Sequence, residues 1–193
     1  MSSLARCPWA AADGPRPDPL MTAYHDDEWG RPTSEDVELF ERLVLESFQA
    51  GLSWSTILRK RAAFRTAFRE FDPALVAAFD DQDRARLMAD PGIVRNRTKI
   101  EATIGNAGGY LAIGSEFGGF DAYLRTIIPD AGQPVPPDTL AGQIPASTPA
   151  SVALSKDLQA RGLRFVGPTI TYAFMQSVGL VDDHLPGCFR YRG

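Results

Sequence analysis

Four residues of this chain could together bind a metal ion, and they are its only cysteines and its only histidines. They are Cys7, His25, His184 and Cys188, the last two spaced as H-x-x-x-C. Zn²⁺ prefers thiolate sulfur and imidazole nitrogen, and four protein ligands make a closed, structural site. A disulfide is the alternative, but the paired histidines and an expected cytosolic setting favour metal. The sequence therefore predicts one structural zinc ion that tethers the two ends of the chain.

Glu46 is a second candidate for chemistry, because it falls on an apolar stripe. The helix expected over about 33–50 has two such stripes, and Glu46 follows Leu39 and Leu43 on the second. Burying a carboxylate is costly unless it has a partner. Glu46 is therefore either an edge glutamate that reaches water or a carboxylate held in an apolar pocket to receive donors from a ligand. Periodicity alone favours neither.

The segment 49–54, Q-A-G-L-S-W, predicts a tight turn between two helices. Gly51 permits close backbone approach, and Leu52 is an apolar residue at the tip of the turn. Such a residue can act as a wedge in a stack of bases. The alternative is an ordinary hydrophobic contact between the two helices.

Two basic clusters could contact phosphate. The formal net charge is −4, so a DNA-binding role requires local clusters. One cluster is Arg59, Lys60, Arg61, Arg65 and Arg69, and the other is Arg95, Arg97 and Lys99. The second follows Gly92 in a predicted short hairpin and lies at the start of a helix, an arrangement that suits a phosphate. The alternative for each cluster is a solvated helix face.

The elements that must position these residues are helices throughout. Residues 1–32 are expected to be irregular, and Thr33, Ser34 and Ser53 are predicted N-caps. Strand signals are weak, and the apolar share of 44% is ordinary for a globular protein. We expect a single all-α domain, 1–193, with two packed helical lobes and a Pro-rich connection at about 129–150. Further helices are expected at 53–70, 73–80, 82–89, 97–112, 118–127, 150–161 and 167–178.

Membrane insertion and secretion are not expected. No apolar run approaches the roughly 20 residues of a membrane span. The first thirty residues contain several prolines and lack an apolar signal core, so a cytoplasmic protein is expected.

Several long strings resemble one known family. They include C-P-W at 7–9, A-Y-H-D-D-E-W-G at 23–30, L-E at 45–46, the 49–54 string and F-V-G at 165–167. Further strings are F-M-Q at 174–176, G-L-V at 179–181 and D-H at 183–184. Together they resemble 3-methyladenine-DNA glycosylase I over roughly residues 5 to 190.

The resemblance implies a helix-hairpin-helix DNA glycosylase fold whose ends are tethered by zinc. Its ligands map onto Cys7, His25, His184 and Cys188, and its hairpin maps onto residues 92–99. Its base pocket maps onto Glu46, Trp54, Tyr24 and Trp9, and its DNA-inserting turn onto Gly51 and Leu52. The implied activity is excision of 3-methyladenine from alkylated double-stranded DNA. The chain departs from the family pattern at Met21, where a Tyr is common, and in an apparent Pro-rich insertion at 11–19.

The resemblance and the residues together predict a monofunctional hydrolase that flips the damaged base into its pocket. Glu46 would accept a hydrogen bond from the exocyclic amine of the base, and Trp9, Tyr24, Trp54 and Met21 would pack on the ring. A lyase step needs an amine nucleophile, and none of Lys60, Lys99 and Lys156 falls in the expected pocket. The alternatives are a zinc-stabilised DNA-binding module without catalysis and a glycosylase with a shifted substrate. A monomer is expected.

Overall fold

The computed structural model describes residues 4–11 and 17–193. Within these ranges the chain is helical, with no strand and one isolated bridge between Pro134 and Asp182. The predicted all-α class is therefore confirmed. No described helix is both long enough and apolar enough to cross a membrane. The α-helices are α1 Pro19–Asp27, α2 Asp36–Gln49, α3 Trp54–Ala67, α4 Pro73–Ala77, α5 Asp81–Ala89, α6 Arg97–Phe117, α7 Phe120–Ile127, α8 Pro149–Ala160 and α9 Pro168–Ser177. The 3₁₀ turns are η1 Pro8–Ala10, η2 Arg69–Phe71 and η3 Ala141–Gln143.

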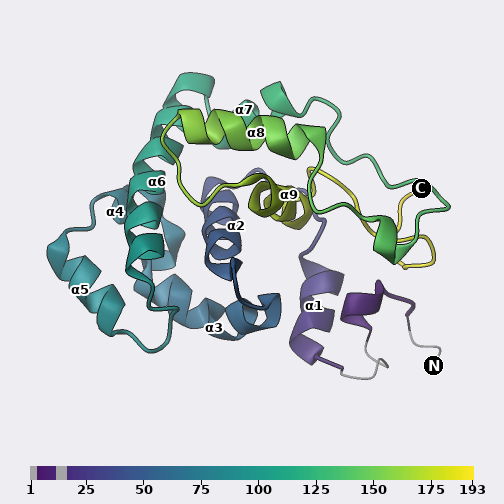
Figure 1. The fold of residues 1–193 in the computed structure, drawn as a ribbon, viewed down its shortest axis with the longest axis horizontal. Helices are drawn as coiled ribbons and strands as arrows, with labels where there is room; N and C mark the ends of the chain where they lie inside the picture. The colour runs from purple at the N-terminus through teal and green to yellow at the C-terminus, as the bar shows by residue number, and fades with distance from the viewer. Residues whose placement is uncertain (1–3, 12–16) are drawn as a thin grey trace.

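Helix α2 lies at the centre of the fold. Every residue from Leu39 to Phe48 is buried, and α3, α6, α7 and α9 pack around the helix. Helices α4 to α6 lie on one side of α2, whereas α1 and both chain ends lie on the other (Figure 1). A helix covered on all sides is normally apolar, so each charged residue on α2 needs a local explanation.

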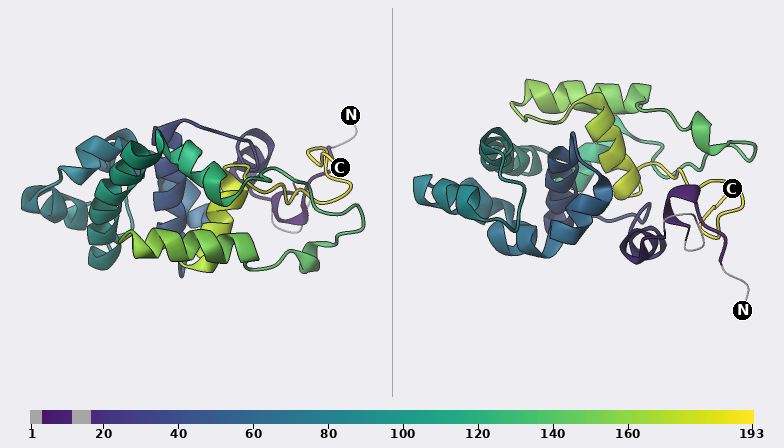
Figure 2. Two further views of the ribbon diagram at one scale, coloured as in Figure 1. Left: turned by 90° about the horizontal axis from the view of Figure 1, so that it is seen from above. Right: turned by 60° about the horizontal axis from the view of Figure 1, so that its bottom comes forward.

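The segment around Cys7 and the C-terminal segment lie on the same side of the fold (Figures 1 and 2), and they are in contact. The backbone N–H of Phe189 donates to the carbonyl oxygen of Ala5 at 2.9 Å. The N–H of Leu185 approaches the Cys7 sulfur at 3.4 Å. The predicted juxtaposition of the ends is thus present in the fold.

The N-terminal region 1–32 was expected to be irregular, and this expectation is wrong for residues 19–27. Residues 19–27 form α1, which starts where Asp18 accepts a hydrogen bond from the N–H of Leu20. Pro19 occupies the first turn, where its missing N–H costs nothing and its fixed φ suits a helix. The prolines therefore mark the start of a helix. Of the Pro-rich stretch 11–19, residues 12–16 lie outside the described residues.

Other boundaries were predicted with mixed success. Ser53 caps α3 as expected, since its side chain accepts from the N–H of Thr56 at 3.2 Å. Thr33 and Ser34 do not cap α2, whose N-cap is Glu35. The Thr33 hydroxyl instead donates to Glu38. Helix α6 continues past the expected residue 112 to Phe117. The connection at 129–150 contains η3, and the division into two lobes stays a prediction.

Candidate functional site

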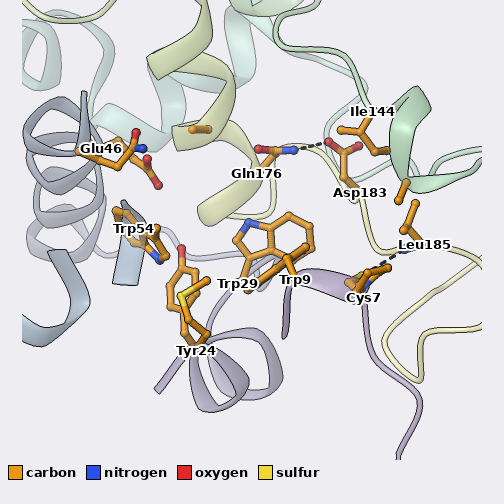
Figure 3. A pocket seen from close by; sticks show the side chains of 15 residues that line it. Cys7, Trp9, Tyr24, Trp29, Glu46, Trp54, Ile144, Gln176, Asp183 and Leu185 are labelled. Atoms are coloured by element: carbon orange, nitrogen blue, oxygen red, sulfur yellow. Dashed lines mark hydrogen bonds between the residues drawn. The ribbon is translucent and has the colours of Figure 1, made fainter. Parts of the chain in front are cut away.

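A cavity of about 460 Å³ opens between α2 and the segments near the chain ends. This volume lies in the range of small-molecule sites. The cavity brings together Glu46 and the four predicted ring-packing residues (Figure 3). Its lining consists of Cys7, Pro8, Trp9, Met21, Tyr24, Trp29, Glu46, Gln49, Trp54, Ala141, Ile144, Ala173, Gln176, Asp183 and Leu185.

Glu46 is the acidic group at the α2 side of the cavity. The residue is only 6% exposed. Burial raises the pKa of its carboxyl to about 8, although the nearby Arg42 guanidinium opposes the rise. The carboxyl therefore keeps its proton to a higher pH than a glutamate in water does. Of the two sequence-based interpretations, the buried carboxyl is the one the structure places here.

Aromatic side chains from three separate elements form the opposite walls. The rings of Tyr24 on α1 and Trp54 on α3 lie 5.2 Å apart between centroids. Trp9, on η1, meets Trp29 edge-on at 5.1 Å and is 41% exposed. The Tyr24 hydroxyl and the Trp54 indole N–H are buried and have no hydrogen-bond partner among the described residues. Such atoms in a cavity are available to a ligand.

Next to the cavity, three of the four predicted metal ligands form a cluster. One ligand atom from each of Cys7, His25 and Cys188 lies within 4.8 Å of the other two. The Cys188 sulfur is 3.4 Å from Nε2 of His25, and both cysteines are free thiols. Burial raises the pKa of the Cys7 thiol to about 12, which is expected for a thiol without a positive partner. This cluster could hold a metal ion.

The fourth predicted ligand, His184, lies beside this cluster. Its ring centroid is 5.1 Å from that of His25, and its Nε2 is buried without a partner in residues 4–11 and 17–193. Nδ1 of His184 is bonded to Asp182 at 2.7 Å, and Nδ1 of His25 to Asp26 at 2.8 Å. Carboxylates that hold one ring nitrogen leave the other directed at a metal.

The α2–α3 turn has the shape expected for a wedge. Gly51 has a φ of +84°, which a residue with a Cβ rarely adopts. Leu52 follows it and is 39% exposed. The apolar tip is therefore presented to solvent rather than packed between the helices.

The expectation for Lys99 needs correction. Lys99 was predicted to contact phosphate, but it is buried. Its ammonium donates to the carbonyl oxygens of Phe48 at 2.9 Å and Ala50 at 2.7 Å. These carbonyls belong to the last turn of α2, where a cation offsets the helix dipole. Lys99 thus supports the α2–α3 turn from inside and is not available to phosphate.

The loop between α5 and α6 presents two exposed arginines. Arg95 and Arg97 are exposed, and Asn96 caps α6 by accepting from the N–H of Lys99. Gly92 packs so closely on α3 that an added Cβ would lie 2.8 Å from Cβ of Ala63. The glycine therefore fixes the loop against α3, and the arginines remain outside.

The other basic cluster, on α3, is neither a bare solvated face nor a free cationic surface. Arg61 and Arg65 pair with the buried Glu41. Lys60 donates to the carbonyl oxygens of Pro91 and Gly92. These three basic side chains of the cluster therefore bind groups of the protein itself.

Among the pocket residues to which the sequence assigned no role are Gln176 and Asp183, which are bonded to each other. Asp183 accepts hydrogen bonds from the Tyr172 hydroxyl at 2.5 Å and from Nε2 of Gln176 at 2.6 Å. Figure 3 shows this pair on the side of the cavity away from Glu46. Their place in the F-M-Q and D-H strings was the available signal, but a string does not tell which side chain faces a cavity.

The fold is all-α, and its apolar, acid-bearing pocket has a volume in the range of small-molecule sites. Comparison with known proteins identifies its family. A profile of the methyladenine glycosylase family matches residues 14–191, and the chain belongs to that family.

Individual relatives agree with this assignment. DNA-3-methyladenine glycosylase 1 of Escherichia coli is 47% identical over 190 residues, covering 98% of both chains. A crystal structure of 3-methyladenine DNA glycosylase I superposes with a TM-score of 0.88 at 45% identity, over 97% of this chain and 100% of the other. A tyrosine-to-phenylalanine variant of such an enzyme in complex with 3-methyladenine gives a TM-score of 0.87 at 35% identity, over 96% and 100%.

Proposed function

We propose that this protein excises 3-methyladenine from alkylated double-stranded DNA as a monofunctional, monomeric glycosylase. The observation that carries this proposal is the buried carboxyl of Glu46 in an aromatic pocket large enough to admit a base. Its family membership and the 3-methyladenine named for a structural neighbour support the same substrate. Because the target base is stacked in a duplex, the nucleotide must be flipped out to reach the pocket, at a cost of a few kcal/mol.

The pocket chemistry favours a damaged base over a normal one. Methylation at N3 gives adenine a positive charge in the nucleotide, and aromatic faces attract a flat cation by about 0.5–2 kcal/mol each. Trp9, Tyr24 and Trp54 supply such faces, and Met21 can pack on the ring edge. The cation favours ionisation of Glu46, which then accepts a hydrogen bond from the exocyclic amine. Neutral adenine cannot drive that ionisation, so it gains less from binding.

Hydrolysis needs little acid catalysis from the protein. The bond between C1′ and N9 breaks with its electron pair passing to the base, which leaves neutral. The oxygen of a water molecule bonds to C1′ and gives its proton to solvent. A lyase step would require an amine, whereas the ammonium groups of Lys60 and Lys99 hold backbone carbonyls and Lys156 is exposed on α8. None of these lysines lines the cavity.

We further propose one structural zinc ion, held by Cys7, His25, His184 and Cys188. The donor set suits zinc, and the unpartnered Nε2 of His184 suits a fourth ligand. The 3.4 Å between the Cys188 sulfur and Nε2 of His25 is close to the roughly 3.5 Å expected for two ligands of one tetrahedral zinc. Zinc would stabilise the cysteines as thiolates and hold the ends of the chain together, so that Trp9 and Tyr24 stay beside Glu46.

The DNA-contacting surface would comprise the Gly51–Leu52 tip and the α5–α6 loop with Gly92, Arg95 and Arg97, used as a helix-hairpin-helix element. An assay for free 3-methyladenine released from methylated duplex DNA tests the proposal. We expect release by the wild type, strong loss in Glu46→Ala and partial loss in Glu46→Gln. No release by the wild type would leave the alternative, a zinc-containing DNA-binding protein with another substrate or no catalysis.

A further inference from the structure

A single line of charged residues runs along α2 towards the pocket. Glu38, Arg42 and Glu46 follow each other at intervals of four residues, so they share one face of the helix. Glu38 lies near the surface, whereas Arg42 is 2% exposed and Glu46 is equally deep in the fold. An arginine buried behind the pocket has no part in the proposed function so far.

Arg42 is paired on one edge only. Its Nη2 donates to Glu28, the residue that ends α1, at 2.9 Å and to Glu38 at 2.9 Å. These two carboxylates neutralise the guanidinium, so it does not expel a cationic base. Its Nε and Nη1 are buried and have no partner within the described part of the chain. Unpaired buried donors are rare and call for an explanation.

The nearest explanation is Tyr24. The guanidinium carbon of Arg42 lies over the Tyr24 ring, 5.6 Å from its centroid. The Tyr24 hydroxyl is also buried and has no partner in the part of the chain that the structure describes, and Figure 3 shows it directed towards Trp54 and Glu46. A guanidinium can only donate hydrogen bonds. Any hydrogen bond between the two groups must therefore run from Arg42 to the phenol oxygen, and the phenol's own hydrogen then points elsewhere.

We propose that Arg42 is a positioning residue of the base pocket, which fixes the Tyr24 hydroxyl as a donor aimed into the cavity and supports Glu46 as a carboxylate. The pocket then offers an acceptor at Glu46 beside a donor at Tyr24. Adenine presents the matching pair, its exocyclic amine next to a ring nitrogen acceptor, whereas guanine presents an oxygen in place of that amine. The inference rests on the proposed function for the identity of the substrate. The contact between Arg42 and Tyr24 is independent of the proposed function.

The charges around Glu46 agree with this role. Arg42 is the charged group that opposes the rise of the Glu46 pKa. Around Arg42 itself lie Glu38 on the same helix, Glu28 from the end of α1, and Tyr24 from α1. Asp183, across the cavity, is engaged by Tyr172 and Gln176. Removal of Arg42 is therefore expected to make ionisation of Glu46 harder.

The test is the pH profile of 3-methyladenine excision by Arg42→Met, Arg42→Lys, Tyr24→Phe and the double variant Tyr24→Phe/Arg42→Met. We expect Arg42→Met to lower kcat/KM about tenfold at pH 9, the effect of one lost charge-assisted hydrogen bond. It should also move the acid limb about one pH unit upward. Arg42→Lys should keep the acid limb but lose kcat/KM, because an ammonium lacks the planar fork.

The double variant separates positioning from general damage. Once the rates are corrected for the upward shift of the acid limb, it should be no slower than Tyr24→Phe alone, since the remaining effect of Arg42 acts through the Tyr24 hydroxyl. A matched control is Arg61→Met, which removes another largely buried arginine bonded to Glu28 and Glu41. The control should lower stability while leaving the acid limb in place. If the losses of kcat/KM in the two single variants multiply in the double variant, the proposal is overturned. An equal upward shift of the acid limb in Arg61→Met would also overturn it.

A second measurement needs no substrate. Urea unfolding of wild type, the two single variants and the double variant gives the coupling free energy between Arg42 and Tyr24. Coupling is expected even if the wild type releases no 3-methyladenine, an outcome that would refute the proposed function but not the contact. Additive effects in this cycle would overturn the contact itself.

Discussion

The ammonium nitrogen of Lys99 lies 2.7 Å from the carbonyl oxygen of Ala50, although 49 positions separate the two residues. This contact joins the start of α6 to the end of α2, just before the proposed DNA-inserting tip. The α5–α6 loop and the Gly51–Leu52 turn are therefore parts of one supported surface.

Lys99→Met should loosen that surface. The carbonyl oxygens of Phe48 and Ala50 would lose their buried donor, which costs about 1–3 kcal/mol. We expect a lower melting temperature and about a tenfold loss of excision from duplex DNA, with affinity for free 3-methyladenine nearly unchanged. Calorimetry, the excision assay and fluorescence titration measure these three quantities. Lys156→Met, at an exposed position on α8, is the control. Equal losses for both variants would contradict the supporting role.

Leu52→Ala tests the tip itself. A wedge fills the gap left by a flipped base, so truncation should reduce excision from duplex DNA by about tenfold. Release from single-stranded DNA, where no stack has to be opened, should change little. Leu75→Ala provides the comparison, because Leu75 is also an exposed leucine, on α4. If Leu52 does not act as a wedge, Leu52→Ala and Leu75→Ala will excise the base from duplex DNA at the same rate.

How far the sequence predicts this site depends on the range of each interaction. Local chemistry was sufficient for Ser53, whose cap bond spans three residues. Periodicity placed Glu46 on an apolar stripe of its helix but left open whether the carboxyl reaches water or is buried. The sequence pattern did not reveal which groups the Lys99 ammonium contacts. A basic residue at the start of a helix can bind a phosphate or can bind carbonyl oxygens that folding brings close to it. The same holds for Arg42, whose partner Glu28 is 14 residues away on another element.

Zinc removal tests the metal proposal. If zinc tethers the chain ends, its binding free energy is part of the folding free energy. We expect one zinc per chain by metal analysis, and a strong chelator should lower the melting temperature by well over the roughly 3 °C that a change of 1 kcal/mol gives. His184→Ala should lose zinc affinity by more than Asp182→Asn, which only releases Nδ1 of that histidine. A metal-free protein of unchanged stability would refute the site.

The pKa of Glu46 makes a prediction about stability. It is raised from 4.5 to about 8 in the fold, so the folded state keeps a proton that the unfolded chain releases. The stability that accompanies the neutral carboxyl is complete below about pH 4.5 and is lost as pH rises through 8. Glu46→Gln cannot ionise and keeps its stability. Urea unfolding at pH 5, 7 and 9 should therefore show that the free energy of unfolding of Glu46→Gln rises relative to that of the wild type as the pH rises, by on the order of a few kcal/mol at pH 9.

Gln82→Glu, a control at a position near the surface of α5, should show no such trend. If the free energies of unfolding of Glu46→Gln and wild type differ by a constant amount across this range, Glu46 is already ionised in the folded protein without a base. The proposal that a cationic base drives the ionisation of Glu46 would then be refuted.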